Sequence, residues 1–254
     1  MTAVENPLTD VKLHKPRPLP PTIFERVLNA AGEVELWRAV NSFRGCFVAG
    51  TLVHTKNGLM SIEKIRVGDF VLSQPEAKGE LAYKRVVKTF VHENKEVYLV
   101  DYGVMNPLVD SEEFDVVNFW DGKDASDLHH LVVTPNHPFW VKGIGWTSVN
   151  QLEPNHVLEL KDGSYAVVLR ALRILVTEES GIGWTYDNHD DFGPKIDLRN
   201  DAVVVSTEDV PNDYIFSFAH SSPDAYIKRR VYNFEVEGFH TYCVGEQGVW
   251  VLSE

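Results

Sequence analysis

The 254-residue sequence has only two cysteines, Cys46 and Cys243, and no Cys-x-x-Cys pair. Two cysteines so far apart cannot build the disulfide framework of a small secreted domain, and a Cys-x-x-Cys zinc site is excluded. No cofactor and no metal is therefore predicted. Basic residues are also scarce, because 24 Lys and Arg stand against 37 Asp and Glu, which gives a formal net charge of −13. Phosphate binding requires a basic face, so nucleic acid and anionic membranes are not expected as partners.

The first 21 residues lack an uninterrupted apolar run, so they predict neither a signal peptide nor a membrane anchor. Four prolines favour an extended backbone there: Pro16, Pro18, Pro20 and Pro21. The whole chain is 44% hydrophobic and 24% charged, which is enough apolar content for one substantial core or two small ones.

A helix is predicted within residues 22–43. Thr22 and Glu25 have the spacing of a capping box. Apolar residues then recur at helical intervals, at Ile23, Val27, Ala30, Val34 and Trp37. Gly32 weakens the middle of this pattern. We take residues 1–45 as one segment, extended at first and then helical, that precedes a second domain at 46–254.

From Cys46 onward, short stretches rich in Val, Ile, Thr and aromatic residues alternate with turn pairs such as Asn57-Gly58 and Asp162-Gly163. This pattern predicts an all-β fold. Residues 172–229 crowd turn formers and acidic residues between two β-rich stretches, so we read them as an insertion. Its cluster at 187–191 (Asp, Asn, His, Asp, Asp) lacks the ligand spacing of a calcium loop, and a solvated acidic loop is the better reading.

Three blocks of sequence share their order and spacing with one known family. They are "GCFVAGTLVHTKNGLMSIEKIRVGDFVL" at 45–72, "VVTPNHPFWV" at 132–141 and "VYNFEVEGFHTYCVGEQGVWV" at 231–251. Together they resemble the Hint family of inteins, hedgehog C-terminal domains and bacterial intein-like domains, with the toxin-associated pretoxin Hint domains as the nearest likeness. The resemblance implies a horseshoe of mostly antiparallel strands that brings the ends of the domain together. It also implies a reaction at the Gly45–Cys46 peptide bond.

The residues themselves allow this chemistry. A thiol directly after a peptide bond can attack the preceding carbonyl and exchange the amide for a thioester, if the bond is distorted and the departing nitrogen is protonated. The resemblance implies that His137 donates this proton and that Thr134 positions or polarises the bond. Taken alone, a histidine before a proline is more often a core or surface residue. The threonine and histidine spacing of the family is what favours catalysis.

The third block carries His240, where the family has a second histidine that assists chemistry at the downstream end. Asn233 stands where many inteins have an aspartate, and an amide cannot act as that acid or base. Asn233 is read as a variation of the toxin-type domains, with a direct role left open. Cys243 lies in a β pattern and is expected to be a buried small apolar residue rather than a redox partner of Cys46.

The His-Asn pair that ends most relatives is replaced here by Leu252 and Ser253. Asparagine cyclisation and splicing are then not expected, and the predicted function is one self-cleavage, between Gly45 and Cys46, of the chain's own polypeptide. The alternative is an idle Hint scaffold that links or docks parts of a polymorphic toxin. A third reading is an excised or edited piece of a longer protein. By analogy, the parent chain would carry toxin or delivery regions and be secreted or delivered at a bacterial surface.

Overall fold

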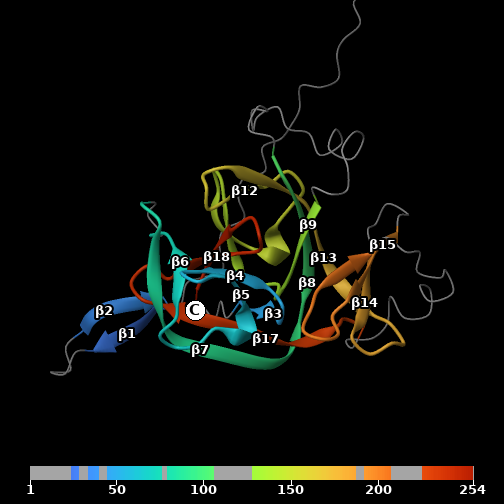
Figure 1. Cartoon of the computed structure of the whole chain (residues 1–254), viewed down its shortest axis with the longest axis horizontal. Helices are drawn as coiled ribbons and strands as arrows, with labels where there is room; N and C mark the ends of the chain where they lie inside the picture. Colours follow the sequence, from blue (N-terminus) through green and yellow to red (C-terminus); the bar gives the residue numbers. More distant parts are fainter. Residues whose placement is uncertain are drawn as a thin grey trace, which may run out of the picture. The chain divides into compact units, whose positions relative to one another are not determined.

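The structure is a computed structural model that describes residues 24–28, 34–39, 45–75, 79–105, 128–186, 192–206 and 225–253 (Figure 1). The chain divides into two compact units, Met1–Ser42 and Phe43–Glu254. Within the described residues, helix is confined to two short 3-10 turns, and every pairing between strands is antiparallel. The expected all-β class is therefore confirmed. None of the helices in the described part of the chain is long and apolar enough to cross a membrane.

The first unit contains a pair of antiparallel strands, and the helix expected within 22–43 is wrong. Strand β1 (Phe24–Leu28) pairs with β2 (Val34–Ala39), with Phe24 opposite Ala39. Each strand contains one valine and one aromatic residue, which fit a pleated strand, although the remaining residues are common in helices. Gly32, which weakened the helical pattern, falls between the two strands. The apolar spacing that suggested a helix also fits two short strands.

The second unit contains the remaining strands. They are β3 (Phe47–Val48), β4 (Leu52–Thr55), β5 (Gly58–Ser61), β6 (Phe70–Ser73), β7 (Ala82–Glu96), β8 (Tyr98–Val104), β9 (Leu128–Val133), β10 (Pro138–Val141), β11 (Gly145–Ser148), β12 (Val157–Glu159), β13 (Tyr165–Val176), β14 (Ile182–Tyr186), β15 (Phe192–Asp197), β16 (Val204–Ser206), β17 (Lys228–Val236), β18 (Thr241–Val244) and β19 (Val249–Leu252). The 3-10 turns are η1 (Ile62–Lys64) and η3 (Val149–Gln151).

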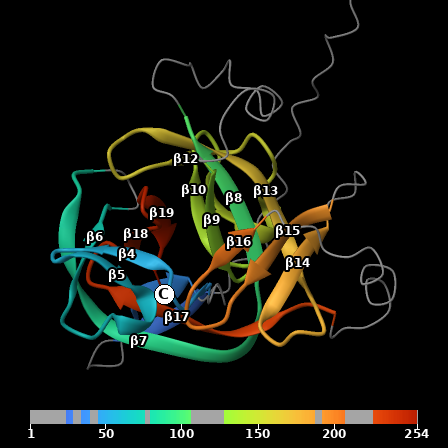
Figure 2. The same ribbon diagram turned by 45° about the vertical axis from the view of Figure 1, so that its right-hand side comes forward.

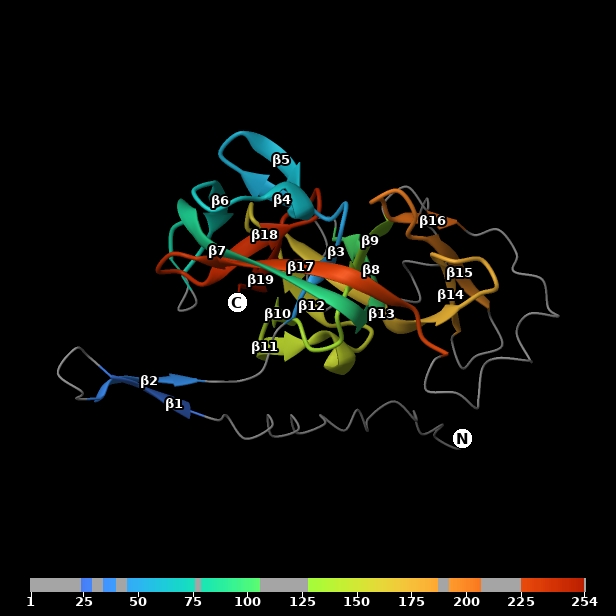
Figure 3. The ribbon, with the colours of Figure 1, turned by 90° about the horizontal axis from the view of Figure 1, so that it is seen from below.

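Two long strands organise this unit. Strand β7 pairs along most of its length with β17, and the two run side by side in Figure 3. Strand β3 is only two residues long and pairs on one side with β9 and on the other with β17. It is thus held by strands that are distant in sequence. This pairing places the start of the second unit between the second and third sequence blocks.

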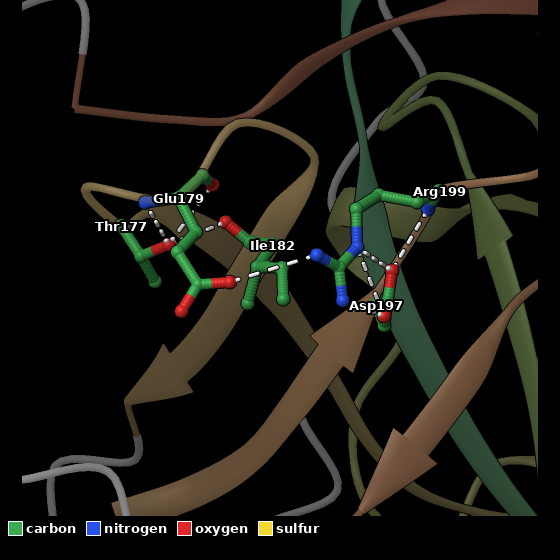
Figure 4. Close-up of polar contacts among 5 residues, drawn as sticks. All are labelled: Thr177, Glu179, Ile182, Asp197 and Arg199. Carbon is green, nitrogen blue, oxygen red and sulfur yellow. Dashed lines mark hydrogen bonds and ion pairs between the residues drawn. The ribbon is translucent and has the colours of Figure 1, made fainter.

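Within the segment interpreted as an insertion, 172–229, strands β14, β15 and β16 and the end of β13 form a small sheet, while its first and last residues pair with β8 and β7 of the main sheet. Strand β13 continues beyond the main sheet to pair with β14, and β15 and β16 follow, as Figure 2 shows in orange. Polar contacts near the surface lie at the turns of this sheet (Figure 4). Thr177 Oγ1 donates to the Ile182 carbonyl at 3.0 Å, and Arg199 Nη2 lies 2.6 Å from Asp197 Oδ2. The acidic cluster at 187–191 lies outside the described residues.

The second unit has two large groups of buried apolar side chains. The larger group packs around Phe47, Phe139, Phe234 and Tyr242. The smaller group joins the main sheet to the insertion, and its members are Cys46, Val48, Val97, Leu99, Val132, Ile174, Ile196, Leu198, Ile227 and Val231. Cys46 and Phe47 are neighbours in the chain, yet they belong to different groups. The backbone of this segment therefore runs between the two parts of the core.

Candidate active site

The Gly45–Cys46 peptide bond comes directly before β3, where three distant segments meet. Phe47 lies opposite Val133 of β9 and opposite Tyr232 of β17. Thr134 follows β9, and Asn233 follows Tyr232 within β17, so both residues come close to the bond. Strand β3 pairs through only two residues with β17 and through one with β9, so its position depends on the longer strands around it. The fold thus brings the second and third sequence blocks to the peptide bond at the start of the first.

Thr134 holds the nitrogen side of this bond. The backbone N–H of Cys46 donates to Thr134 Oγ1 at 2.8 Å, and the backbone N–H of Thr134 donates to the Cys46 carbonyl at 2.9 Å. Both hydrogen bonds are formed away from water, because Cys46 is fully buried and Thr134 is 3% exposed. Sequence reasoning expected the hydroxyl to position or polarise the bond. In the structure it contacts the nitrogen that would leave, and not the carbonyl oxygen.

Asn233 holds the carbonyl side. Its Nδ2 donates to the Gly45 carbonyl oxygen at 2.6 Å, in a buried position. An N–H aimed at this oxygen would stabilise the negative charge that develops there when a nucleophile attacks the carbonyl carbon. Sequence reasoning considered only an acid or base role for this residue and left a direct role open. The signal that could have identified it is that an asparagine, unlike an aspartate, can donate a hydrogen bond.

His137 packs directly against Gly45. A Cβ placed on Gly45 would come within 2.5 Å of His137 Nδ1, so the ring and the glycine are in close contact. The ring is fully buried and lies tilted against the Phe47 ring, with 4.4 Å between ring centroids and 59° between the ring planes. Burial lowers the pKa of His137 to about 3, and the Gly45 backbone opposes this only in part. No hydrogen bond of normal length and angle reaches either ring nitrogen from the described residues, so the Gly45 backbone acts on the ring only weakly. His137 is thus a neutral imidazole beside the peptide bond.

The side chain of Cys46 is 0% exposed and lies in the smaller apolar group. The same group contains Ile174 of β13 together with Ile196 and Leu198 beside the β15–β16 turn. Gly50 lies against this turn, since a Cβ on Gly50 would meet the Asp201 carbonyl. A cavity of about 350 Å³ opens nearby, lined by Val48, Ala49 and Tyr232 among others, and Cys46 is not part of its lining. The insertion therefore contributes to the burial of the thiol.

His240 is not brought to this bond. Its side chain is exposed, and its backbone has a positive φ of 54° directly before β18. Its carbonyl accepts a hydrogen bond from the backbone N–H of Ser253 at 2.7 Å, so the residue contacts the downstream end of the domain. The role predicted for His240 concerns chemistry at this downstream end and not at the Gly45–Cys46 bond. It stays a prediction.

The second cysteine is a buried thiol. Cys243 is 1% exposed in β18, and burial raises its pKa to about 12. The two cysteines do not form a disulfide with each other. In the parts of the chain that the structure describes, no group of three or more His, Cys, Asp or Glu side chains could hold a metal ion.

Comparison with known proteins identifies the family of this fold. A family model described as "Pretoxin HINT domain" matches residues 52–175. The chain contains a Hint domain. The matched range includes Thr134 and His137, while Cys46, Asn233 and His240 lie outside it. The Hint fold is that of self-processing domains in general, and the resemblance inferred from the three sequence blocks is confirmed.

Solved structures of similar proteins are inteins and an intein-like domain. A bacterial intein-like domain from Clostridium thermocellum is 23% identical, with a TM-score of 0.48, over 82% of this chain and 98% of that chain. A DnaB intein from Synechocystis sp. PCC 6803 is 12% identical, with a TM-score of 0.46, over 83% and 99%. The gp41-1 intein is 15% identical, with a TM-score of 0.44, over 82% and 98%. No curated protein matched the chain. The Hint assignment depends on the family model and not on these structures.

Proposed function

We propose that this Hint domain cleaves its own chain once, between Gly45 and Cys46, through a thioester at Cys46. One observation carries the proposal: both sides of this one peptide bond are held by side chains from distant blocks. Thr134 Oγ1 accepts from the Cys46 nitrogen at 2.8 Å, and Asn233 Nδ2 donates to the Gly45 oxygen at 2.6 Å. His137 packs against the same glycine. A purely structural segment would not need this set of contacts around a single bond.

The first step is an acyl transfer from nitrogen to sulfur. For this step the Cys46 side chain must turn out of the smaller apolar group toward Gly45. Its thiol then gives its proton to the neutral imidazole of His137, and the sulfur attacks the Gly45 carbonyl carbon. The oxygen then carries the negative charge, next to Asn233 Nδ2. As the carbon–nitrogen bond breaks, His137 returns the proton to the Cys46 nitrogen, which Thr134 holds. The products are a thioester between Gly45 and Cys46 and a free α-amine on Cys46. The low pKa of His137 makes it a weak base but a strong acid once it is protonated.

The second step frees the first segment. Water or a small thiol attacks the thioester carbonyl, the carbon–sulfur bond breaks, and the Cys46 thiol takes up a proton. With water, the products are residues 1–45 ending in a carboxylate and residues 46–254 beginning with Cys46. With a small thiol, the first product is a new thioester. Leu252 and Ser253 stand where most relatives have a His-Asn pair, so asparagine cyclisation does not follow at these positions.

A second candidate function is an idle Hint scaffold, and the buried thiol favours it. A Cys46 side chain with 0% exposure is out of reach of water until the insertion or its neighbours move. In this reading the domain links or docks regions of a longer toxin chain, a context to which the match with pretoxin Hint domains lends support. The two candidates differ in one measurable property, namely whether the Gly45–Cys46 bond breaks.

The test is the intact mass of the freshly purified chain over time, with and without dithiothreitol. We expect a species that begins at Cys46 to accumulate and to form faster with the thiol, because dithiothreitol resolves the thioester. A matching species with residues 1–45 linked to dithiothreitol should appear. Cys46→Ala should abolish both. Cys243→Ala is the matched control, because it removes the other buried cysteine and should leave the rate unchanged.

Two further variants separate the roles of the site. Asn233→Ala removes one donor to the carbonyl oxygen, and loss of such a donor slows cleavage about 10²–10³-fold in other enzymes. His240→Ala should leave cleavage at Gly45 unchanged, since the His240 side chain is exposed. A full-length mass that is stable with the thiol present, at neutral and mildly alkaline pH, would refute cleavage and leave the scaffold reading.

A further inference from the structure

The side-chain oxygen of Asn233 accepts a hydrogen bond from Tyr242, a residue that the cleavage scheme does not use. Asn233 Oδ1 accepts from the backbone N–H of Phe234 at 2.8 Å and from the hydroxyl of Tyr242 at 2.9 Å. The backbone N–H can only donate and the Gly45 carbonyl can only accept, so the two ends of the amide are fixed without ambiguity. The orientation that aims Nδ2 at the Gly45 oxygen is therefore imposed by these partners.

Tyr242 is well placed to act on this amide. It is 0% exposed in β18, and its ring packs on Phe234 with 4.3 Å between centroids. The same ring meets the rings of His137 and Phe47 edge-on, each at 6.4 Å. A buried hydroxyl needs a partner, and the Asn233 oxygen supplies it. Tyr242 is thus packed firmly among the side chains that surround the peptide bond.

We propose that Tyr242 is a positioning residue for the cleavage, and that it acts through Asn233. Its hydroxyl fixes the rotation of the Asn233 amide and draws electron density toward Oδ1. Hydrogen bonds in a chain polarise one another, so Nδ2–H becomes a stronger donor to the Gly45 oxygen. The hydroxyl does not touch the reacting atoms. The inference rests on the proposed function, because its effect on rate requires that the Gly45 carbonyl be attacked.

The hydrogen bonds of Asn233 explain why an amide suits the proposed cleavage at this position better than a carboxylate. A carboxylate at position 233 could accept from both Phe234 and Tyr242, but it would have no hydrogen to give to the Gly45 oxygen. It would also place a negative charge beside an oxygen that becomes negative. Asn233→Asp therefore keeps the size of the side chain and both of its accepted hydrogen bonds, while it removes the donated one.

The experiment has two readouts, and one of them does not depend on cleavage. In the full chain with Cys46→Ala, position 45–46 becomes the only Gly–Ala pair in the sequence. Labelling with [1-¹³C]glycine and [¹⁵N]alanine then gives a single carbonyl–nitrogen NMR correlation for Gly45. We expect Tyr242→Phe to move the Gly45 carbonyl resonance upfield, because the hydrogen bond to its oxygen weakens. Tyr102→Phe is the matched control, since Tyr102 is another buried tyrosine of the same core.

The second readout is the rate of cleavage with Cys46 present. Loss of one neutral hydrogen bond is worth about 1 kcal/mol, so Tyr242→Phe should slow cleavage about fivefold. In the Asn233→Ala background, Tyr242→Phe should have no further effect, because the residue it acts through is gone. Tyr102→Phe should cleave at the original rate. If Tyr242→Phe fails to fold, Asn233→Asp tests the link through which Tyr242 would act, namely whether the Nδ2 donor sets the Gly45 resonance.

The outcomes separate this inference from the proposed function. If no chain cleaves, the proposed function fails, while an upfield shift in Tyr242→Phe still supports positioning by Tyr242. If the original chain cleaves, and Tyr242→Phe leaves both its rate and the Gly45 resonance unchanged, the positioning role is refuted. An unchanged Gly45 resonance in Asn233→Asp refutes it as well, because Asn233 would then not polarise the carbonyl.

Discussion

Gly45 leaves no room for a side chain, and this is a first test at the scale of single residues. A Cβ at this position would lie within 2.5 Å of both Cβ and Nδ1 of His137, and even closer to its Cα. The His137 backbone cannot yield easily, because its N–H donates to Thr134 and its carbonyl accepts from Val149. We expect Gly45→Ala to push the Gly45 carbonyl and the imidazole apart. Overpacking of this kind costs about 1–3 kcal/mol of stability.

The expected result for Gly45→Ala is a loss of cleavage larger than its loss of stability explains. The measurement is the cleavage rate by intact mass, beside the unfolding free energy in denaturant. Gly79→Ala serves as the control, because the atoms nearest to a Cβ there belong to the Pro75 side chain, the first at 3.1 Å, and not to the site. Cleavage of Gly45→Ala at the original rate would show that close contact with His137 is not needed.

His137 should make stability depend on pH. Its pKa falls from an ordinary 6.5 to about 3 in the folded chain, through burial. Between these two values the unfolded chain binds a proton at this residue and the folded chain does not. The free energy of unfolding therefore decreases as the pH falls from about 6.5 toward 3, by up to about 1.4 kcal/mol per pH unit. Above pH 6.5 this contribution is constant.

The measurement for His137 is urea unfolding of Cys46→Ala against pH, with and without a second change, His137→Gln. We expect the difference between the two chains to shrink as the pH falls through this window. His54 and His156 also have lowered pKa values through burial, but they are present in both chains and cancel. Parallel curves would show that His137 takes up a proton in the folded chain as readily as in the unfolded one.

At the scale of residues, the sequence indicated three members of the candidate site but missed the hydrogen bond from Asn233 to Gly45. Cys46, Thr134 and His137 were identified because their types and spacing match a known motif. The hydrogen bond from Asn233 to Gly45 could not be predicted in this way. It depends on the direction of one amide, which Phe234 and Tyr242 determine from a neighbouring position and a different strand.

At the scale of elements, the segment interpreted as an insertion helps to bury the Cys46 thiol. Ile196 is 0% exposed and belongs to the same buried group as Cys46. Truncation of a buried isoleucine to alanine costs about 2–5 kcal/mol. If about 1.4 kcal/mol of this falls on local opening around Cys46, labelling of the thiol becomes about tenfold faster. We expect this for Ile196→Ala, measured with iodoacetamide and peptide mass in a chain that His137→Gln keeps from cleaving.

The second cysteine is the internal reference for this labelling experiment. Cys243 lies outside that buried group, so its labelling should stay slow unless the whole domain opens. Val71→Ala is the matched variant, because Val71 is equally buried but belongs to the larger group. Equal acceleration at both cysteines would mean general destabilisation, and no acceleration at Cys46 would mean that the insertion does not shield the thiol.

The sequence predicted the type of most elements in 46–254 but not of those before it. Alternating β-branched residues and turn pairs indicated strands, and strands are found. The helix expected within 22–43 was wrong because its apolar residues fit two spacings at once. Two short strands with a glycine between them can imitate a helical repeat. Only pairing, such as Phe24 with Ala39, decides between the two readings.

At the scale of the whole molecule, the pairings of β3 predict what cleavage leaves behind. Strand β3 remains held by β9 and β17 after the bond before Cys46 breaks. The N-terminal residues up to Ser42 form a separate unit. Within the described part of the second unit, cleavage frees the Gly45 oxygen from its hydrogen bond with Asn233, which is worth about 1 kcal/mol. Residues 46–254 should therefore still unfold in a single cooperative transition.

Cleavage also creates a charge that the intact chain does not have. The new α-amine of Cys46 starts at a fully buried position, with Thr134 Oγ1 as its neighbour, and a buried positive charge opposes folding. In the unfolded fragment the amine gains its proton below about pH 8. The stability of fragment 46–254 should therefore fall as the pH decreases from about 9 to 6, while the uncleaved Cys46→Ala chain lacks this contribution. Thermal unfolding of the two proteins across this range measures the difference. Identical pH profiles would show that the amine moves out to water after cleavage.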